Sequence, residues 1–384
     1  MLGEILSVVW LLLLGYAIGK SPPYNEVASA RQGRFFPFYT IGRFRNSVCT
    51  GGNNLLGTCQ VNGECSDNGG IATGSCSTVT AQAVCCVYQL ACGRSTSFNN
   101  TYFYNPGFPA SYRGGNRCSI QVSRCDESIC QLRIDFLDFS LAQPNGDGSC
   151  LTDYMTVTGG SSRVPRLCGE NTGQHVYVDF NGNAPISIAM LTTGSDSFAR
   201  HWNFRLSQIA CDSEYRAPSG CLQYYLDETS GDTPLQSFNY APMPNPAPNS
   251  IGVTGTRQLA GMQYGICIRM GANMCSITYA LPDGQPYAFT MTGDVGAIDP
   301  TLLGTIDVSS QACNTDYVII PHPNQNGALL NSGSDRFCGL GFAPTTSDIK
   351  PFVLYVVQDN NEILDIANRG FALTYSQGQC SVVL

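Results

Sequence analysis

Short runs of alternating apolar and polar residues dominate the chain from residue 88 onward. In residues 131–136, 175–180 and 185–190 every second side chain is apolar, which is the pattern of a β-strand with one buried face. Gly and Pro interrupt the runs, and no window has the 3.6-residue period of an amphipathic helix. The pattern predicts an all-β fold made of antiparallel, jelly-roll-type β-sandwiches.

The β-rich part repeats one cysteine motif. Cys-x-x-Asp-Tyr followed by Cys-Gly occurs at residues 150–154 and 168–169, and returns at 313–317 and 338–339. A repeat of roughly 120 to 160 residues has the length of a domain and is too long for a solenoid unit. The sequence therefore predicts two related sandwiches.

The first residues predict export from the cell. Residues 5–18 form an apolar run that closes with Ala17-Ile18 and is followed by Gly19, as in a signal peptide, so we expect residues 1–19 to be removed. The run is too short to span a bilayer of about 30 Å. Residues 20–48 are basic and aromatic without periodicity and are predicted to be a linker. Within it, 31–34 match Arg-x-x-Arg, which is either a processing site or part of a solvated linker.

Cysteine is abundant, with 19 residues that all follow this leader. Such a number in an exported chain indicates disulfides rather than metal sites. Six of them lie within residues 49–87, which have almost no apolar positions, so this small module depends on its bridges for stability. Because 19 is odd, one thiol is either free or bonded to another chain.

Charge and histidine content exclude two classes of function. The formal net charge is −8, and an acidic body repels phosphate backbones, so we expect no nucleic-acid partner. The three histidines are His175, His201 and His322, each in a strand or turn pattern typical of a structural residue. No Gly-x-Ser-x-Gly elbow occurs, and we expect no enzyme activity.

The markers of the first sandwich together resemble a CUB domain, an extracellular β-sandwich of complement proteases, astacin-like proteases and many secreted insect proteins. The resemblance covers residues 88–211 and, with more divergence and a Pro-rich insert at 241–248, residues 212–384. Its markers are Asn105-Pro106-Gly107-Phe108-Pro109 between Cys92 and Cys118, the aromatic run 132–139, Cys150-x-x-Asp153-Tyr154, Cys168-Gly169 and Trp202-x-Phe204.

The module at residues 49–87, which ends in an adjacent Cys-Cys pair, resembles the clip domain that precedes serine proteases in arthropod haemolymph cascades. The whole layout is similar to secreted arthropod proteins with two CUB domains. The clip-like resemblance implies the pairs Cys49–Cys85, Cys59–Cys76 and Cys65–Cys86.

The CUB resemblance implies four further bridges: Cys92–Cys118, Cys150–Cys168, Cys221–Cys267 and Cys313–Cys338. Cys125 and Cys130 lie close in sequence and are expected to close a small loop. Cys211, Cys275 and Cys380 then remain, with one bridge among them in any of three pairings. The cysteine left over is the candidate for a disulfide-linked dimer.

Many CUB domains bind calcium through a Glu and two Asp residues. In the first copy Asp153 is present, but Ala142 stands at the Glu position and Thr192 or Thr193 at the second Asp position, so we expect no calcium there. The second copy has Asp316 and Asp359, with Asp294 near the Glu position, which predicts a weak calcium site. The alternative is that Asp153 and Asp316 hydrogen-bond the turn before the Tyr strand.

One glycosylation sequon occurs, at Asn99-Asn100-Thr101. The aromatic residues nearby, Tyr102, Phe103, Tyr104 and Phe108, form either a binding rim or the filling of the sandwich end.

The sequence predicts a secreted, non-enzymatic adaptor that binds extracellular proteins or glycans, with no cofactor other than calcium. Two alternatives remain open: an extracellular-matrix component cross-linked by the odd cysteine, and a regulator of a clip-domain protease cascade. Function on such folds depends on the loops at the sandwich ends, so the ligand itself cannot be inferred.

Overall fold

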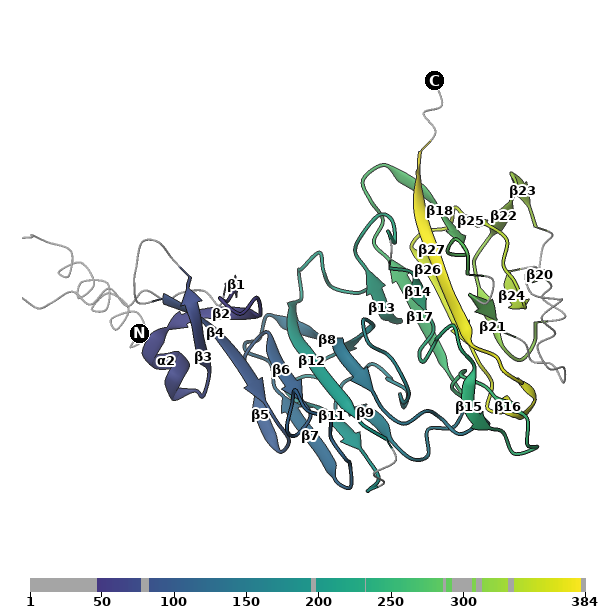
Figure 1. Ribbon diagram of the computed structural model, residues 1–384. Helices are drawn as coiled ribbons and strands as arrows, with labels where there is room; N and C mark the ends of the chain where they lie inside the picture. Colours follow the sequence, from purple (N-terminus) through teal and green to yellow (C-terminus); the bar gives the residue numbers. More distant parts are fainter. Residues whose placement is uncertain are drawn as a thin grey trace, which may run out of the picture. The chain divides into compact units, whose positions relative to one another are not determined.

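The computed structural model describes residues 47–76, 83–194, 198–231, 233–285, 288–291, 306–308, 313–330 and 335–380. These residues form a small N-terminal module and two β-sandwiches (Figure 1). The predicted signal peptide and Arg31–Arg34, as well as most of the predicted linker, lie outside the described residues. None of the described helices has the length and apolar character needed to cross a bilayer.

The N-terminal module is a small sheet with one short helix. Its strand β4 continues into the first sandwich, where residues 88–90 pair in parallel with β6. The module has a very small apolar cluster around Tyr88, so its bridges carry much of its stability. Its elements are β1 (Val48–Thr50), β2 (Leu56–Val61), α2 (Asn62–Asp67), β3 (Ile71–Ser75) and β4 (Ala83–Leu90).

The first sandwich packs the strands β6-β12-β8-β10 against the strands β5-β7-β11-β9. Alternation places Phe136, Phe139 and Phe204 between the sheets, where they are at most 1% exposed; each such side chain contributes roughly 1.5–3 kcal/mol of burial. Its strands are β5 (Arg94–Thr96), β6 (Thr101–Tyr104), β7 (Arg117–Val122), β8 (Ile129–Ser140), β9 (Tyr154–Thr158), β10 (His175–Asp179), β11 (Ile186–Leu191) and β12 (His201–Ala210).

The second sandwich has one sheet of order β13-β17-β26-β21-β24-β20 and one of order β14-β27-β18-β25-β22-β23, with β19 pairing with β27. A separate ribbon pairs β15 (Asn245–Pro248), which belongs to the Pro-rich insert, with β16 (Thr254–Gly255), which follows the insert. The other elements are β13 (Cys221–Tyr225), β14 (Leu235–Gln236), β17 (Gln263–Ile268), β18 (Met274–Ala280), β19 (Phe289–Thr290), β20 (Ile306–Val308), β21 (Tyr317–Ile319), β22 (Pro323–Gln325), β23 (Ala328–Leu329), β24 (Arg336–Gly339), β25 (Thr345–Ser347), β26 (Phe352–Val357), η2 (Glu362–Leu364) and β27 (Gly370–Gln379).

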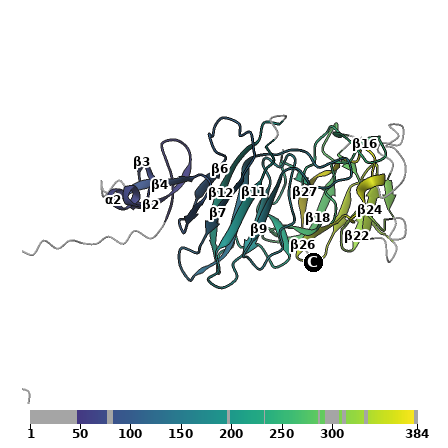
Figure 2. The same ribbon diagram turned by 90° about the horizontal axis from the view of Figure 1, so that it is seen from below.

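The two sandwiches share one topology. The order β5-β7-β11-β9 corresponds to β13-β17-β26-β21, and β6-β12-β8-β10 corresponds to β14-β27-β18-β25. Even the parallel pairs recur, because β5 with β7 and β13 with β17 are both parallel. The all-β fold and the internal repeat predicted from the sequence are confirmed (Figures 1 and 2).

All 19 cysteines are described, and 18 of them form nine bridges. Seven pairs are those that the two resemblances implied: Cys49–Cys85, Cys59–Cys76, Cys65–Cys86, Cys92–Cys118, Cys150–Cys168, Cys221–Cys267 and Cys313–Cys338.

The expected Cys125–Cys130 loop is wrong. Cys130 on β8 bonds Cys211 at the end of β12, because β8 and β12 pair and bring Ile129 opposite Ala210. In the same way β18 pairs with β27, and Cys275 bonds Cys380. Cys125, rather than Cys211, Cys275 or Cys380, is the free cysteine.

Of the aromatic residues near the sequon, only Phe103 belongs to the core of the sandwich. Tyr102 and Phe103 are buried, while Tyr104 and Phe108 are half-buried and pack on each other at 5.6 Å between ring centroids. Asn99 is half-buried, and its Oδ1 accepts hydrogen bonds from the backbone N–H groups of Asn100 and Gln208, both at 2.8 Å. Glycosylation of Asn99 stays a prediction.

Candidate metal centre

The repeated Cys-x-x-Asp-Tyr motif places one buried aspartate at the same point of each sandwich, just before β9 and β21. Asp153 and Asp316 are each 1% exposed. Asp153 Oδ1 accepts a hydrogen bond from the N–H of Thr193 at 3.0 Å, and Asp316 Oδ1 accepts one from the N–H of Asp359 at 2.9 Å. Each aspartate therefore hydrogen-bonds to a distant loop, the one after β11 in the first sandwich and the one after β26 in the second. The alternative prediction, in which they hydrogen-bond the turn before the Tyr strand, does not account for these contacts.

In the first sandwich an arginine neutralises the aspartate. Arg200 donates from Nε to Asp153 Oδ2 at 2.6 Å and from Nη2 to Asp153 Oδ1 at 3.2 Å, and both side chains are 0% exposed. The backbone N–H of Ala142 donates a hydrogen bond to Asp153 Oδ2 at 3.2 Å. Ala142 and Thr193 offer no carboxylate, and the guanidinium already supplies the positive charge, so this position does not fit a calcium ion.

Sequence reasoning did not anticipate Arg200. Arg200 and Asp153 lie 47 residues apart, so no local pattern predicts their ion pair. The only sequence feature that marks Arg200 is its place two residues before Trp202 of the closing strand.

In the second sandwich several carboxylates converge. One carboxylate oxygen from each of Asp316, Asp359 and Glu362 lies within 4.8 Å of the others. Asp365, on the same loop as Glu362, is 2% exposed and hydrogen-bonds with the Asp316 and Glu362 side chains. We call Asp316, Asp359, Glu362 and Asp365 the acidic cluster. Within the described part of the chain, no salt bridge neutralises any member.

Burial without a counter-charge changes the acidity of the cluster. Burial raises the pKa of Asp316 to about 6 and, together with the charge of Asp316, raises that of Asp365 to about 9. Burial and the neighbouring Asp316 and Asp365 also raise the pKa of Glu362 well above its usual value. The cluster therefore favours any positive charge that can enter it.

Two buried oxygens of this region have no hydrogen-bond donor. Glu362 Oε1 and Gln258 Oε1 are without a partner, although each residue is only 1% exposed. The Gln258 amide lies at the cluster, since its Nε2 donates to Glu362 Oε2 at 3.1 Å and to Asp316 Oδ2 at 3.4 Å.

A hard cation bound by oxygen ligands would satisfy both the charge and the unpartnered oxygens. Asp316 and Asp359 lie together as the sequence suggested. Glu362 begins the short helix η2, Asp365 follows it and Gln258 lies in a loop. No recognisable sequence motif marks these three residues, so sequence reasoning missed them. Asp294 lies outside the described residues.

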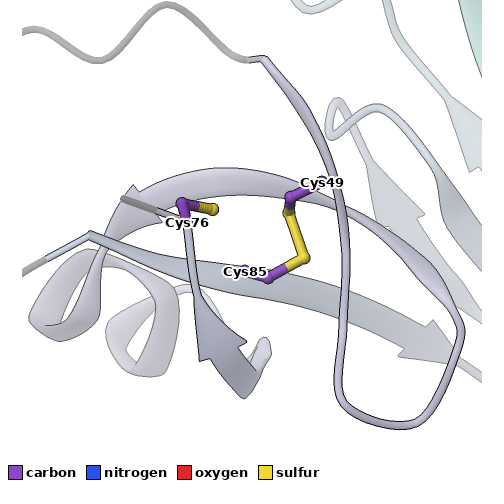
Figure 3. A group of neighbouring side chains, drawn as sticks. All are labelled: Cys49, Cys76 and Cys85. Carbon is purple, nitrogen blue, oxygen red and sulfur yellow. A yellow bond between two sulfur atoms is a disulfide. The ribbon is translucent and has the colours of Figure 1, made fainter. Parts of the chain in front are cut away.

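A second group of possible ligands does not form a metal site. The Sγ atoms of Cys49, Cys76 and Cys85 lie within 4.8 Å of one another, and Figure 3 shows the Cys49–Cys85 bridge beside Cys76. Cys76 is itself bonded to Cys59. Metal ligation needs thiolates, and all three sulfurs are used in disulfides.

The free thiol of Cys125 is half-buried between β7 and β8. Burial, and next the negative charge of Asp126, raise the pKa of Cys125 to about 11. Because the thiolate is the reactive form, this thiol reacts slowly at neutral pH.

Family models match both sandwiches. Residues 92–205 match the CUB domain model and residues 218–378 match the Animal CUB domain model. Cubilin of Sus scrofa is 26% identical over 133 residues, which are 31% of this chain and 3% of cubilin. The matched stretch is thus a small part of that relative.

Solved structures of related domains were also found. The CUB1-EGF-CUB2 domains of rat MASP-1 match at 14% identity and a TM-score of 0.25, covering 76% of this chain and 99% of that one. The MASP-1 CUB2 domain bound to Ca²⁺ matches at 18% identity and a TM-score of 0.26, covering 30% and 98%. From the two model matches and the shared topology, we conclude that this chain contains two CUB domains in tandem.

Proposed function

We propose that this protein is secreted, has no enzyme activity and binds extracellular proteins or glycans through its CUB domains, with a calcium ion held in the second domain. Asp316, Asp359, Glu362 and Asp365 would hold the ion. Bound calcium would neutralise the cluster and order the loop at residues 358–366, so that the loop presents one fixed surface to a partner.

The contrast between the two domains carries the calcium part of the proposal. Equivalent aspartates are buried in both, but the first has Arg200 as its counter-ion, whereas the second has three more carboxylates. Burying several carboxylates without a counter-charge is costly, and a divalent cation removes that cost.

The bridges support secretion. Nine disulfides form and persist in an oxidising compartment and are rare in the cytosol. The predicted signal peptide at residues 1–19 agrees with this location.

The two alternative functions are a cross-linked extracellular-matrix component and a regulator of a clip-domain protease cascade. A matrix component cross-linked by the odd cysteine is disfavoured, because the Cys125 thiol is half-buried and its pKa is raised to about 11. Regulation of a clip-protease cascade remains the second candidate, since the N-terminal bridges have the clip-like pairing.

The test is capture from native extracellular fluid. The full chain, produced by secretion and immobilised, is compared in calcium and in EGTA, with Asp316→Asn as the calcium-blind variant and the exposed Asp212→Asn as the matched control. We expect a partner that the wild type and the control retain in calcium, and that EGTA or Asp316→Asn releases. Failure of the chain to be exported, or capture that is indifferent to both calcium and Asp316→Asn, would contradict the proposal.

A further inference from the structure

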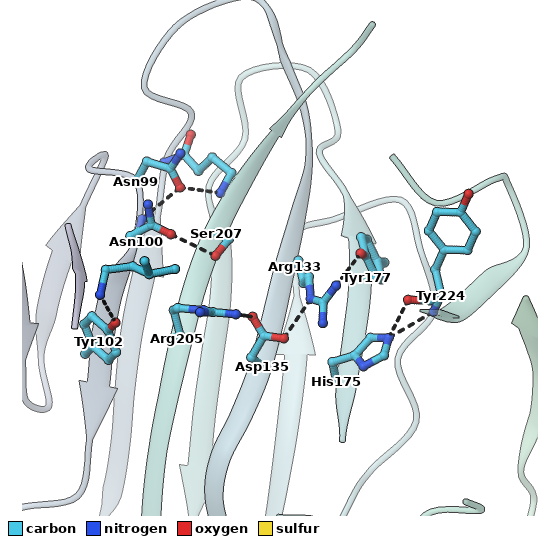
Figure 4. A network of polar contacts seen from close by, with 12 residues as sticks. Asn99, Asn100, Tyr102, Arg133, Asp135, His175, Tyr177, Arg205, Ser207 and Tyr224 are labelled. Atoms are coloured by element: carbon cyan, nitrogen blue, oxygen red, sulfur yellow. Dashed lines mark hydrogen bonds and ion pairs between the residues drawn. The ribbon is translucent and has the colours of Figure 1, made fainter. Parts of the chain in front are cut away.

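The two CUB domains dock on each other through many hydrogen bonds. Gln131 of β8 exchanges two hydrogen bonds with the backbone of Ala217, at 2.9 and 3.2 Å. His175 Nε2 lies 3.0 Å from both the N and the O of Tyr224. Figure 4 shows the pair His175 and Tyr224 beside the network Arg205, Asp135, Arg133 and Tyr177.

A loop of the first domain makes the other half of this docking contact. We call residues 144–149, between β8 and Cys150, the joint loop. It accepts five hydrogen bonds from the second domain: Asn245 Nδ2 to Pro144 O at 3.0 Å and to Asn145 O at 3.4 Å, Thr256 N–H to Gly146 O at 3.1 Å, Ser250 N–H to Asp147 Oδ1 at 2.9 Å and Ala260 N–H to Gly148 O at 3.0 Å. The Pro-rich insert is therefore part of the docking contact.

The joint loop also touches the acidic cluster. Gly148 has a φ of +75°, and a Cβ at this position would lie 2.7 Å from both Glu362 Cγ and Gln258 O. Glu362 and Gln258 are the residues with the unpartnered buried oxygens, and the Gln258 amide hydrogen-bonds to Glu362 and Asp316. Asn249 Nδ2, next to the docking contact, holds the carbonyl of Ile363 in η2 at 2.8 Å.

We propose that the metal site of the second domain is shared with the first: the joint loop fixes Glu362 and Gln258, so calcium binding and domain docking strengthen each other. This inference rests on the proposed calcium binding. A bound cation would draw the Glu362 carboxylate toward Asp316 and Asp365, and the stem of Glu362 lies against Gly148, so the position of the joint loop affects the position of this ligand. Thermodynamic linkage then requires that whatever loosens the docking also weakens calcium binding.

The first test changes the first domain and measures calcium binding by the second. Gly148→Ala crowds Glu362 and Gln258. Gly93→Ala is the matched control, because Gly93 has a φ of +76° in the same domain and a Cβ added there would meet nothing within 4 Å. In calorimetric titrations of the full chain with CaCl₂, we expect Gly148→Ala to weaken binding on the order of tenfold and Gly93→Ala to leave it unchanged.

The second test needs no variant and decides the matter if Gly148→Ala fails to fold. Hydrogen exchange of the wild type is compared in calcium and in EGTA. We expect calcium to protect the amides that cross the docking contact, those of Thr256, Ala260 and Glu170, the last of which donates to Asn239 Oδ1 at 3.0 Å.

The outcomes separate the two proposals. In one outcome calcium slows hydrogen exchange only at residues 313–317 and 358–366, while Gly148→Ala binds calcium as tightly as the wild type. These two results together would overturn the shared site but leave the proposed calcium site intact. A chain that binds no calcium at all would overturn both.

Discussion

Asp153 and Asp316 occupy equivalent places in the two CUB domains, but only Asp153 faces a guanidinium among the residues described. The same buried carboxylate is therefore stabilised in two ways. Arg200 supplies a counter-charge in the first domain, whereas for the acidic cluster of the second domain we propose a calcium ion in that role.

Replacing Asp153 will destabilise the first domain strongly. Asp153→Asn removes the carboxylate that pairs with the fully buried guanidinium of Arg200, which costs about 3–5 kcal/mol in the free energy of unfolding. Urea denaturation measures the loss, with the exposed Asp212→Asn as the control. A loss for Asp153→Asn no larger than that of the control would show that the ion pair does not stabilise the domain.

Lowering the pH should reduce the free energy of unfolding, because His175 is buried in its neutral form. Burial, and next the charge of Arg133, lower the pKa of His175 to about 3 from its ordinary 6.5. Below pH 6.5 the unfolded chain takes up a proton that the folded chain refuses, so stability falls as the pH drops toward 3, by up to about 1.4 kcal/mol per pH unit.

His175→Gln should remove that part of the pH dependence. The comparison is the free energy of unfolding at pH 7 minus that at pH 5, for the wild type and for the variant. The groups that face His175 are Arg133, Asp135, Tyr177, Tyr224 and Tyr225, and all remain in the variant. An equal pH difference in both proteins would rule out His175 as the cause.

The thiol of Cys125 should stay free, and the protein should not form dimers linked through it. Its pKa of about 11 keeps it protonated, so we expect one thiol that reacts slowly with Ellman's reagent in the native protein and fast after denaturation. Wild type and Cys125→Ser should run as monomers on a non-reducing gel. A wild-type dimer that the variant lacks would instead favour the cross-linked matrix component.

The sandwiches could be predicted because alternation and the cysteine repeat are local properties of the sequence. The bridges of Cys130 with Cys211 and of Cys275 with Cys380 could not, because strand pairing sets them over separations of 81 and 105 residues. The two bridges are equivalent in the repeat, since β8 with β12 corresponds to β18 with β27.

The residues of the proposed metal site could be predicted only in part, for a related reason. Asp316 belongs to a motif with fixed spacing, and Asp359 follows a strand that the repeat identifies. Glu362 and Gln258 belong to no recognisable motif, and they meet through contacts between residues far apart in the sequence, as does the Pro-rich insert with the joint loop. Contacts between domains have no periodicity from which a sequence can reveal them.

Calorimetric titration of the secreted full chain with CaCl₂ tests the central claim most directly. We expect one ion per chain, bound with a dissociation constant of about 0.1–1 mM, as in other extracellular calcium modules. Glu362→Gln and Asp316→Asn should each weaken binding at least tenfold, by removing one of the buried carboxylates, and Asp212→Asn should not. Absence of binding, or binding that survives both substitutions in the acidic cluster, would contradict the account.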